Sequence, residues 1–480
     1  MKQQWGPLLI VTVLLLVPLA WPQTGAGDAS QSGAGDWGQQ TASASPQSGS
    51  GDTSQSGAES GQQPASEGPQ PVFTHPEDRP PLALLSEVTA NSYLNLGLGL
   101  TTAWDSNAGT FAYRPYSAAW FIVSPSLEVR QTRPTLTWYV GAAGGFTTAT
   151  NAGYYNTANP TARAGLLYQI NAHWQLNVRD SYLYSYDPFQ RYLTYSSAPT
   201  FNQPNPTIYV PLTTTESNYG NIDLTYQING RDSITWSGAE SFQRYLHSAY
   251  SAYDLYSYAG GSYYQHRISA RLAVGGGYTF TALDFGHGTS RSGISLVQIF
   301  ASYQLGPHMY VSGWAGPEYT ATKNLVPILC LPSGCFIELF HNTAWDDAFG
   351  GSFGWQGQRN AINLTFYKAV SDGGILLGVV RLYQFNGNFL RQLSPRWSFN
   401  GSLQYGNNTG YSTAFNARHL NSFIANAGLV RQVTPRVTAS LLYFRYYETQ
   451  KNLIGAFAPK WIDNRIQFTL QYGWGHSLGR

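Results

Sequence analysis

Residues 465–474 read RIQFTLQYGW, and apolar and polar side chains alternate along this stretch. The even-numbered residues from Ile466 to Trp474 are apolar or aromatic, whereas the odd-numbered residues from Arg465 onward are polar or glycine. Because successive side chains of a β-strand point to opposite faces, this pattern predicts a strand with one apolar and one polar face. The stretch also has the length of roughly 9–11 residues that a tilted strand needs to cross a bilayer.

The same alternation recurs in long runs from Asn91 onward. Even-numbered leucines over 94–100 oppose asparagine, glycine and threonine, and similar runs lie over 267–280 and 396–405. Soluble sheets favour shorter strands, of about five or six residues. The chain is therefore predicted to be all-β, a transmembrane antiparallel up-and-down β-barrel of about 18 strands, in a range of roughly 16–20. Near Asp180, Glu240 and Arg381 the parity is ambiguous, which predicts a bulge or a register slip at each.

The composition fits such strands and excludes several functions. Charged residues make up 11% of the chain and aromatic residues 15%, with 50 glycines and 34 tyrosines. A soluble domain would carry more charge, on average about 25%. The net charge of +2 gives no reason to expect nucleic acid as a partner. With two cysteines and scattered histidines, the sequence predicts neither a metal site nor a cofactor.

The turns between the runs are of two kinds. Longer irregular stretches, such as 185–215 and 321–344, alternate with short turns that each carry one basic residue. Bacterial barrels have short periplasmic turns and long outer loops. The short turns contain the segments Gln131-Thr132-Arg133-Pro134, Asn171-Ala172-His173, Asn229-Gly230-Arg231-Asp232, His266-Arg267, Gly306-Pro307-His308, Gly357-Gln358-Arg359-Asn360, Ser394-Pro395-Arg396 and Thr434-Pro435-Arg436.

The first ninety residues are predicted to contain a secretory signal peptide and a linker. Residues 1–26 have the basic start and the apolar run of a secretory signal peptide, with cleavage after Ala20 or Ala26. An uncleaved membrane anchor is the alternative, although the apolar run is short for a helix that spans a membrane. Residues 27–90 are rich in Gly, Ser and Gln and then in Pro, which predicts a disordered linker. The barrel is expected over 91–474, followed by a short tail, 475–480.

The final strand ends in the aromatic Trp474, six residues before the end of the chain. It resembles the C-terminal insertion signal of bacterial outer-membrane proteins, and residues 91–474 resemble a porin-type barrel at the level of the class. The resemblance implies a place in the outer membrane of a Gram-negative envelope, with outer-membrane lipid and the outer-membrane assembly machinery as partners. Because the short turns recur about every forty residues, a soluble propeller or a sandwich is the alternative fold. Long strands with alternating parity favour the barrel.

A barrel of about 18 strands can leave a water-filled channel. We expect a channel for passive diffusion of small hydrophilic solutes, and the excess of arginine over lysine gives it a bias toward anions. The alternative is that the arginines form structural ion pairs or lie by the turns at the mouth. Polar parity predicts the pore-lining residues Arg163, Arg179, Asp223, Arg267, Arg271, Arg396 and Arg465, with Glu128 and Asp346 as further acids.

The stretch 321–344 is unusually apolar for an outer loop, and it contains both cysteines. Four residues separate Cys330 from Cys335, and the two are expected to form a disulfide in an oxidising compartment. The loop then folds into the channel mouth, contacts a protein or a lipid, or forms a small stapled hairpin on the barrel rim.

Two other functions stay open. An envelope structural, adhesion or export-associated barrel without general pore activity would make use of the linker and the apolar loop. A hydrolase is less favoured: His287 lies between Asp284 and Ser290 in a glycine-rich loop, but the segment matches no catalytic motif, so we expect no enzyme activity. Assembly into a homo-oligomer is possible, but no interface is visible in the sequence.

Overall fold

The computed structural model describes residues 92–108, 117–150, 157–186, 214–247, 251, 253–331, 334–373, 378–410, 419–451 and 460–477. Nearly all of these residues lie in one antiparallel sheet. Its strands are β1 (Tyr93–Asp105), β2 (Ala118–Thr132), β3 (Leu136–Ala143), β4 (Phe146–Ala149), β5 (Thr157–Ala158), β6 (Thr161–Gln169), β7 (Trp174–Ser185), β8 (Thr215–Gln227), β9 (Asp232–Tyr245), β10 (Leu255–Arg267), β11 (Leu272–Phe285), β12 (Ser290–Gly306), β13 (Met309–Leu331), β14 (Gly334–Gln356), β15 (Asn360–Asp372), β16 (Val379–Ser394), β17 (Trp397–Gly410), β18 (His419–Thr434), β19 (Val437–Lys451) and β20 (Lys460–Ser477). A short 3-10 helix, Gly286–Gly288, joins β11 to β12. In the described part of the chain, no helix is long and apolar enough to cross a membrane.

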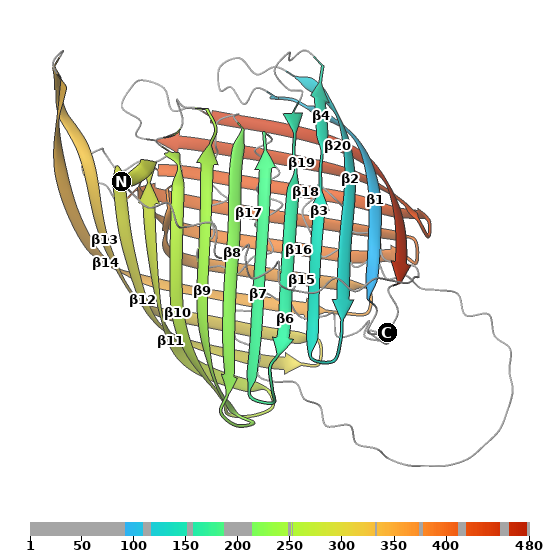
Figure 1. Ribbon diagram of the computed structural model, residues 1–480, viewed down its shortest axis with the longest axis horizontal. Helices are drawn as coiled ribbons and strands as arrows, with labels where there is room; N and C mark the ends of the chain where they lie inside the picture. The colour runs from blue at the N-terminus through green and yellow to red at the C-terminus, as the bar shows by residue number, and fades with distance from the viewer. Residues whose placement is uncertain are drawn as a thin grey trace, which may run out of the picture.

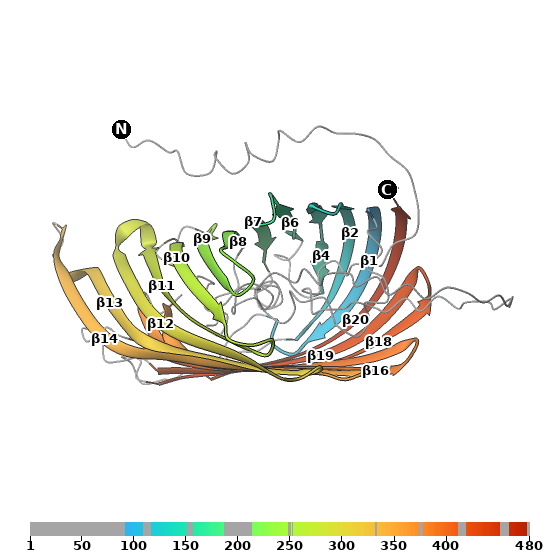
Figure 2. The same ribbon diagram turned by 90° about the horizontal axis from the view of Figure 1, so that it is seen from below.

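The sheet closes on itself to form a barrel of 18 strands. β3 and β4 both pair with β2, so they are two parts of one strand. β5 pairs with β4 and β6 pairs with β3, so these two segments also form one strand. β1 pairs with β2 on one side and with β20 on the other, which closes the ring (Figures 1 and 2). The prediction of an antiparallel porin-type barrel of about 18 strands is confirmed.

The two faces of the wall differ as the alternation predicts. On β1, Leu96, Leu98 and Leu100 are 38–43% exposed, whereas Asn95 and Thr101 are buried. The other strands repeat this arrangement, with large apolar side chains exposed around the outside of the barrel. An apolar outer band around a closed antiparallel sheet is the surface of a barrel that spans a membrane.

The start of the first strand and the end of the last strand lie at the rim of the barrel that carries the short turns. Tyr93, the first residue of β1, pairs with Ser477, the last residue of β20. β20 therefore runs three residues past Trp474. Eight turns of two to four residues join the strands at this rim, and we call it the turn rim. The signal peptide and the linker, residues 1–90, lie outside the described residues.

The predicted bulges near Asp180, Glu240 and Arg381 are wrong. The register of the neighbouring strands is continuous through all three residues. Asp180 and Glu240 confuse the pattern because they lie on the outward face, in register with Gly220 between them. Register shifts occur elsewhere, and three of the four adjoin the turn rim. The shifts lie between Gln304 and Gly306, Pro327 and Leu329, Gln392 and Ser394, and Gln432 and Thr434.

The predicted outer loop over 321–344 is instead the end of a hairpin. β13 and β14 pair with each other as far as Leu331 and Gly334. β12 accompanies β13 only as far as Asn324, so the end of the hairpin extends beyond its neighbour. In both views this end stands clear of the other strands at the left (Figures 1 and 2). Among the expected arrangements, the structure favours the hairpin, and Cys330 lies in register with Cys335.

Candidate functional site

The inner face of the barrel is lined by uncharged polar side chains that bond to one another across the strands. Hydroxyl groups of register partners lie 3.0 Å apart in Thr225 and Thr235 and 2.9 Å apart in Thr101 and Thr469. Ser312 and Ser352 repeat the contact at 2.6 Å. Such pairs satisfy polar groups that face inward and stabilise neighbouring strands.

The seven predicted pore-lining residues fall into two groups. Arg163, Arg179, Asp223, Arg267 and Arg465 lie on strands with inward parity. Arg271 and Arg396 do not belong to the wall, because they lie exposed in the turns between β10 and β11 and between β16 and β17. Strand alternation does not extend into a tight turn, so parity misplaced these two residues.

Arg465 is buried and does not present its charge to the interior. Its Nη2 and Nε atoms lie 2.9 and 3.2 Å from Oδ2 of Asp105, the register partner on β1. The guanidinium also lies over the ring of Trp120, with 5.7 Å between Cζ and the ring centroid. Asp463 lies beside this pair, and the backbone N–H of Asn107 donates to both carboxylates. This cluster joins the first and last strands of the barrel.

Arg163 is also paired with an acid. Its Nη2 atom contacts Oε2 of Glu128 across Gly141, the residue of β3 that lies between them in the register. A Cβ atom at Gly141 would lie 3.3 Å from the Arg163 side chain, so glycine leaves room for the pair. The hydroxyl of Tyr93 donates to the other oxygen of Glu128 over 3.1 Å. Arg163 and Arg465 both form ion pairs within the wall, as the alternative interpretation of the inward arginines predicted.

Asp223 is held by neutral donors on the inner wall. Its carboxylate accepts hydrogen bonds from Ser237 Oγ at 2.7 Å and from the side-chain amides of Asn221 and Asn177 at 3.1 and 3.5 Å. The three donors come from β7, β8 and β9. Hydrogen bonds from three neighbouring strands therefore fix the position of this carboxylate on the inner wall.

The turn rim carries the largest set of basic residues in the described part of the chain. Each of the eight short turns contains one exposed basic residue, and none of these turns contains Asp or Glu. The set forms a ring because the turns follow one another around the closed barrel. We call it the basic ring: Arg133, His173, Arg231, Arg271, His308, Arg359, Arg396 and Arg436. No ion pair joins a residue of this ring to an acid of the described ranges.

A side chain earlier in each of five turns fixes the backbone of the ring residue. Oδ1 of Asn171 accepts the N–H of His173 at 2.8 Å, and Oδ1 of Asn229 accepts that of Arg231 at 2.8 Å. Ser269, Ser394 and Thr434 accept the N–H of Arg271, Arg396 and Arg436 at 3.2–3.3 Å. Such Asx and Ser/Thr turns set the bend of the chain, and here they repeat the same position for the basic residue.

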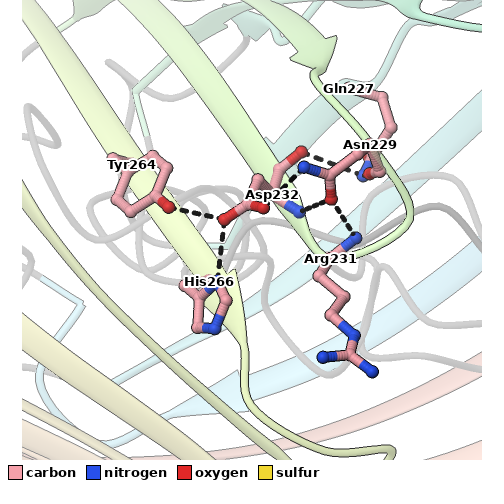
Figure 3. Close-up of polar contacts among 6 residues, drawn as sticks. All are labelled: Gln227, Asn229, Arg231, Asp232, Tyr264 and His266. Carbon is pink, nitrogen blue, oxygen red and sulfur yellow. Dashed lines mark hydrogen bonds and ion pairs between the residues drawn. The ribbon is translucent and has the colours of Figure 1, made fainter.

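Figure 3 shows the turn between β8 and β9. The side-chain amide of Gln227, the last residue of β8, donates to the carbonyl oxygens of Asn229 and Asp232. The carboxylate of Asp232 accepts hydrogen bonds from the Tyr264 hydroxyl, from Nδ1 of His266 at 2.7 Å and from the Asn229 amide at 2.7 Å (Figure 3). These three donors, in that order, lower the pKa of Asp232 to about 2, and the residue lies at the turn, outside the membrane-spanning stretch.

Two residues of the glycine-rich loop around His287 contact other side chains. Asp284 pairs with Arg291 at 3.1 Å, and the Ser290 hydroxyl donates to the side-chain oxygen of Asn324. The side chain of His287 lies outside the described residues. No group of three or more His, Cys, Asp or Glu side chains in the described ranges could hold a metal ion.

No protein-family model matches the chain, and no curated protein matches it. Its barrel is similar to solved bacterial structures, with low sequence identity. Pseudomonas aeruginosa OpdL is 11% identical, with a TM-score of 0.40, and the match covers 80% of this chain and 99% of that one. Acinetobacter baumannii OccAB2 is 11% identical (TM-score 0.41; 80% and 98% covered). Pseudomonas aeruginosa OccK2 in complex with glucuronate is 9% identical (0.39; 81% and 97%).

Proposed function

We propose that the chain is an outer-membrane channel for passive diffusion of small hydrophilic solutes, with a preference for anions. The observation that carries the proposal is the closed 18-stranded wall, apolar outside and lined inside by hydroxyl and amide groups. Barrels of this size enclose space for hydrated solutes. Outer-membrane lipid and the assembly machinery are the partners that such a protein requires.

The basic ring supports the preference for anions. Wall arginines such as Arg163 and Arg465 are paired with acids, so they contribute little net field inside the barrel. The ring places up to six permanent positive charges, and two histidines, around one mouth without acids in the same turns. Charges of one sign around an opening raise the local concentration of the opposite ion. Salt screens this effect beyond about 8–10 Å at physiological ionic strength, so it is strongest in dilute salt.

Recording in planar lipid bilayers tests the proposal. The purified protein should give discrete conductance steps, and a KCl gradient should give a reversal potential of the sign expected for chloride preference. A variant in which Arg231, Arg271, Arg359, Arg396 and Arg436 are all replaced by Gln should conduct with a clearly smaller preference. The matched control replaces the wall pair, Arg163→Gln with Glu128→Gln, and should keep the selectivity of the wild type.

The outcomes separate the parts of the proposal. A wild-type barrel that is folded but gives no conductance would contradict the channel itself. A ring variant with unchanged reversal potential in dilute salt would contradict only the source of the anion preference.

One observation favours a second function, an envelope structural or adhesion barrel. The β13–β14 hairpin extends beyond the neighbouring strand β12, and Leu339 on this extension is 50% exposed. An exposed apolar hairpin is a surface for contact with another protein. Deletion of residues 325–340 should then abolish partner capture in envelope extracts while conductance stays. Deletion of residues 27–80 tests the linker in the same assay.

A further inference from the structure

The wall of the barrel is interrupted between β14 and β15 at the end away from the turn rim. These strands pair from Gln356 and Ala361 up to Phe349 and Lys368, and there the register ends. β15 continues for four more residues, 369–372, which still pair with β16 on their other side. By continuation of the register, residues 345–348 of β14 should be the partners of these four residues, but the two segments do not pair.

Along β15, the side chains of one face are exposed in the middle of the strand but buried at its outer end. Leu364 and Phe366 lie on the outward face and are exposed, as lipid-facing residues should be. Lys368, Val370 and Asp372 continue the same face but are only 5–8% exposed. Something therefore covers the outward face of β15 at this end, since the register with β16 is unbroken.

The cover is the inner face of the neighbouring wall. Val370 of β15 and Val379 of β16 belong to one buried cluster with inward-facing residues of β10, β11 and β12. These inward-facing residues are Leu255, Leu283, Phe285 and Ile294. The outer ends of β15 and β16 therefore lie inside the barrel, against the inner side of the wall that precedes them. The wall is two layers thick at this place, and we call it the overlap.

Polar contacts hold the two layers together. Glu318, which faces inward from β13, accepts the backbone N–H of Val370 at 2.8 Å, in place of a carbonyl oxygen of β14. Asp346, inward on β14, accepts Nζ of Lys368 at 2.9 Å and Nε of Arg381 at 2.5 Å. Asp346 and Lys368 are buried, with 7–8% of each side chain exposed. Lys368 also contacts Asp347 on the outer side, so it fills the gap between the strands.

From this arrangement we propose that the outer ends of β15 and β16 are the constriction of the channel and can leave the lumen. In the open wall, residues 369–372 would complete the ladder with residues 345–348, and the lumen would widen by the volume of the two strand ends. Backbone hydrogen bonds between these four residue pairs then replace the Glu318 contact, the Asp346 ion pairs and the apolar cluster. Elements with two alternative packings of this kind can switch as a unit. The inference rests on the proposed channel function.

A disulfide that can form only in the open wall tests the proposal. Ala348→Cys with Ala369→Cys would face each other if the register continued past Phe349 and Lys368. The matched control is Ser352→Cys with Thr365→Cys, a pair that is already in register in the same two strands. Because antiparallel positions alternate in hydrogen-bonding type, pairs four residues apart are geometrically equivalent. Peptide mass spectrometry after mild oxidation in lipid vesicles reports each link.

Both pairs should link, and only the first should change the channel. We expect oxidised Ala348→Cys/Ala369→Cys to conduct at least about twice as much as its reduced form, while the control conducts alike in both forms. Failure of the first pair to link while the control links would overturn the proposal, as would linking with no change in a conducting barrel. A wild type without conductance would refute the channel function instead, and linking of the first pair would still establish the movement.

The polar contacts give a second test. Asp346→Asn, added to the first cysteine pair, removes the carboxylate that both Lys368 and Arg381 contact, so the link should form roughly ten times faster. Asp347→Asn is the control, because the Asp347 side chain is 71% exposed and contacts Lys368 alone. Its effect on the rate should be less than about threefold, as for an exposed ion pair. Equal rates in the two variants would contradict a role of Asp346 in holding the overlap.

Discussion

Replacement of Arg465 by Met should cost the barrel about 3–5 kcal/mol of unfolding free energy, the range for breaking one partner of a buried ion pair. Arg465 is 6% exposed and Asp105 is 1% exposed, and the two residues join the strands that close the ring. Without the guanidinium, the carboxylates of Asp105 and Asp463 remain buried beside each other. The contact of the guanidinium with the Trp120 ring, about 0.5–1 kcal/mol in comparable sites, is lost as well.

Equilibrium unfolding in urea, with the barrel refolded in phospholipid vesicles and followed by tryptophan fluorescence, measures this loss. Arg271→Met is the control, because it removes the same charge from an exposed turn and should change the stability by less than about 0.5 kcal/mol. Adding Asp105→Asn to Arg465→Met should recover more than about 1 kcal/mol, since it removes one uncompensated buried charge. If Arg465→Met and Arg271→Met are equally stable, the structural role of the buried pair is refuted. The reversal potential of Arg465→Met should match the wild type, because its charge is already compensated by Asp105.

Three further predictions concern the turns and the hairpin. Asn229→Ala removes the acceptor of two backbone N–H groups and should cost about 1–2 kcal/mol in the same urea assay, whereas Asn229→Asp keeps the acceptor and should cost less. Because hydrogen bonds lower the pKa of Asp232 to about 2 in the folded protein, below its ordinary value, its contribution to stability is present above that ordinary value and is lost as the pH falls toward 2. The stability difference between wild type and Asp232→Asn should shrink over that range, and a difference independent of pH would contradict the hydrogen bonds as its source. Cys330 and Cys335 are register partners, so non-reducing peptide mapping should recover them as one linked peptide; two free thiols in protein purified without reductant would speak against the pairing.

The strands and their faces could be predicted because a membrane-spanning wall repeats one simple rule. A side chain on the outward face meets lipid and a side chain on the inward face meets polar groups, so alternation, strand length and the short turns together predicted a barrel of about 18 strands. The same rule gave the inward parity of Arg163 and Arg465 but not their partners. Asp105 lies 360 residues from Arg465, and only the closing register of β1 with β20 brings the two together.

The basic ring was present in the sequence as eight turns with one basic residue each, but strand parity directed attention to the wall. The sequence signal for the ring is a basic residue two positions after Asn, Ser or Thr, which occurs in five of the turns. That spacing recurs because a side-chain oxygen accepts the N–H two residues on, whatever the tertiary structure around the turn. A local rule of this kind can be recognised in a sequence without knowledge of the register.

The overlap could not be predicted, for a physical reason. Lys368 and Val370 continue the parity of Leu364 and Phe366, and alternation reports which face a side chain lies on but not what covers that face. Lysine on a lipid-facing parity was nevertheless a sign of conflict, since a charge there is costly at the depth of the membrane. The structure resolves the conflict by placing this end of β15 beneath β13 and β14, where Asp346 and Glu318 supply acceptors. Arg381, where the parity was ambiguous, lies on β16 at the same place and contacts the same Asp346. Lys368 and Arg381 therefore mark the place where the wall becomes two layers thick, and a single-layered wall with these two residues facing lipid would be the less stable arrangement.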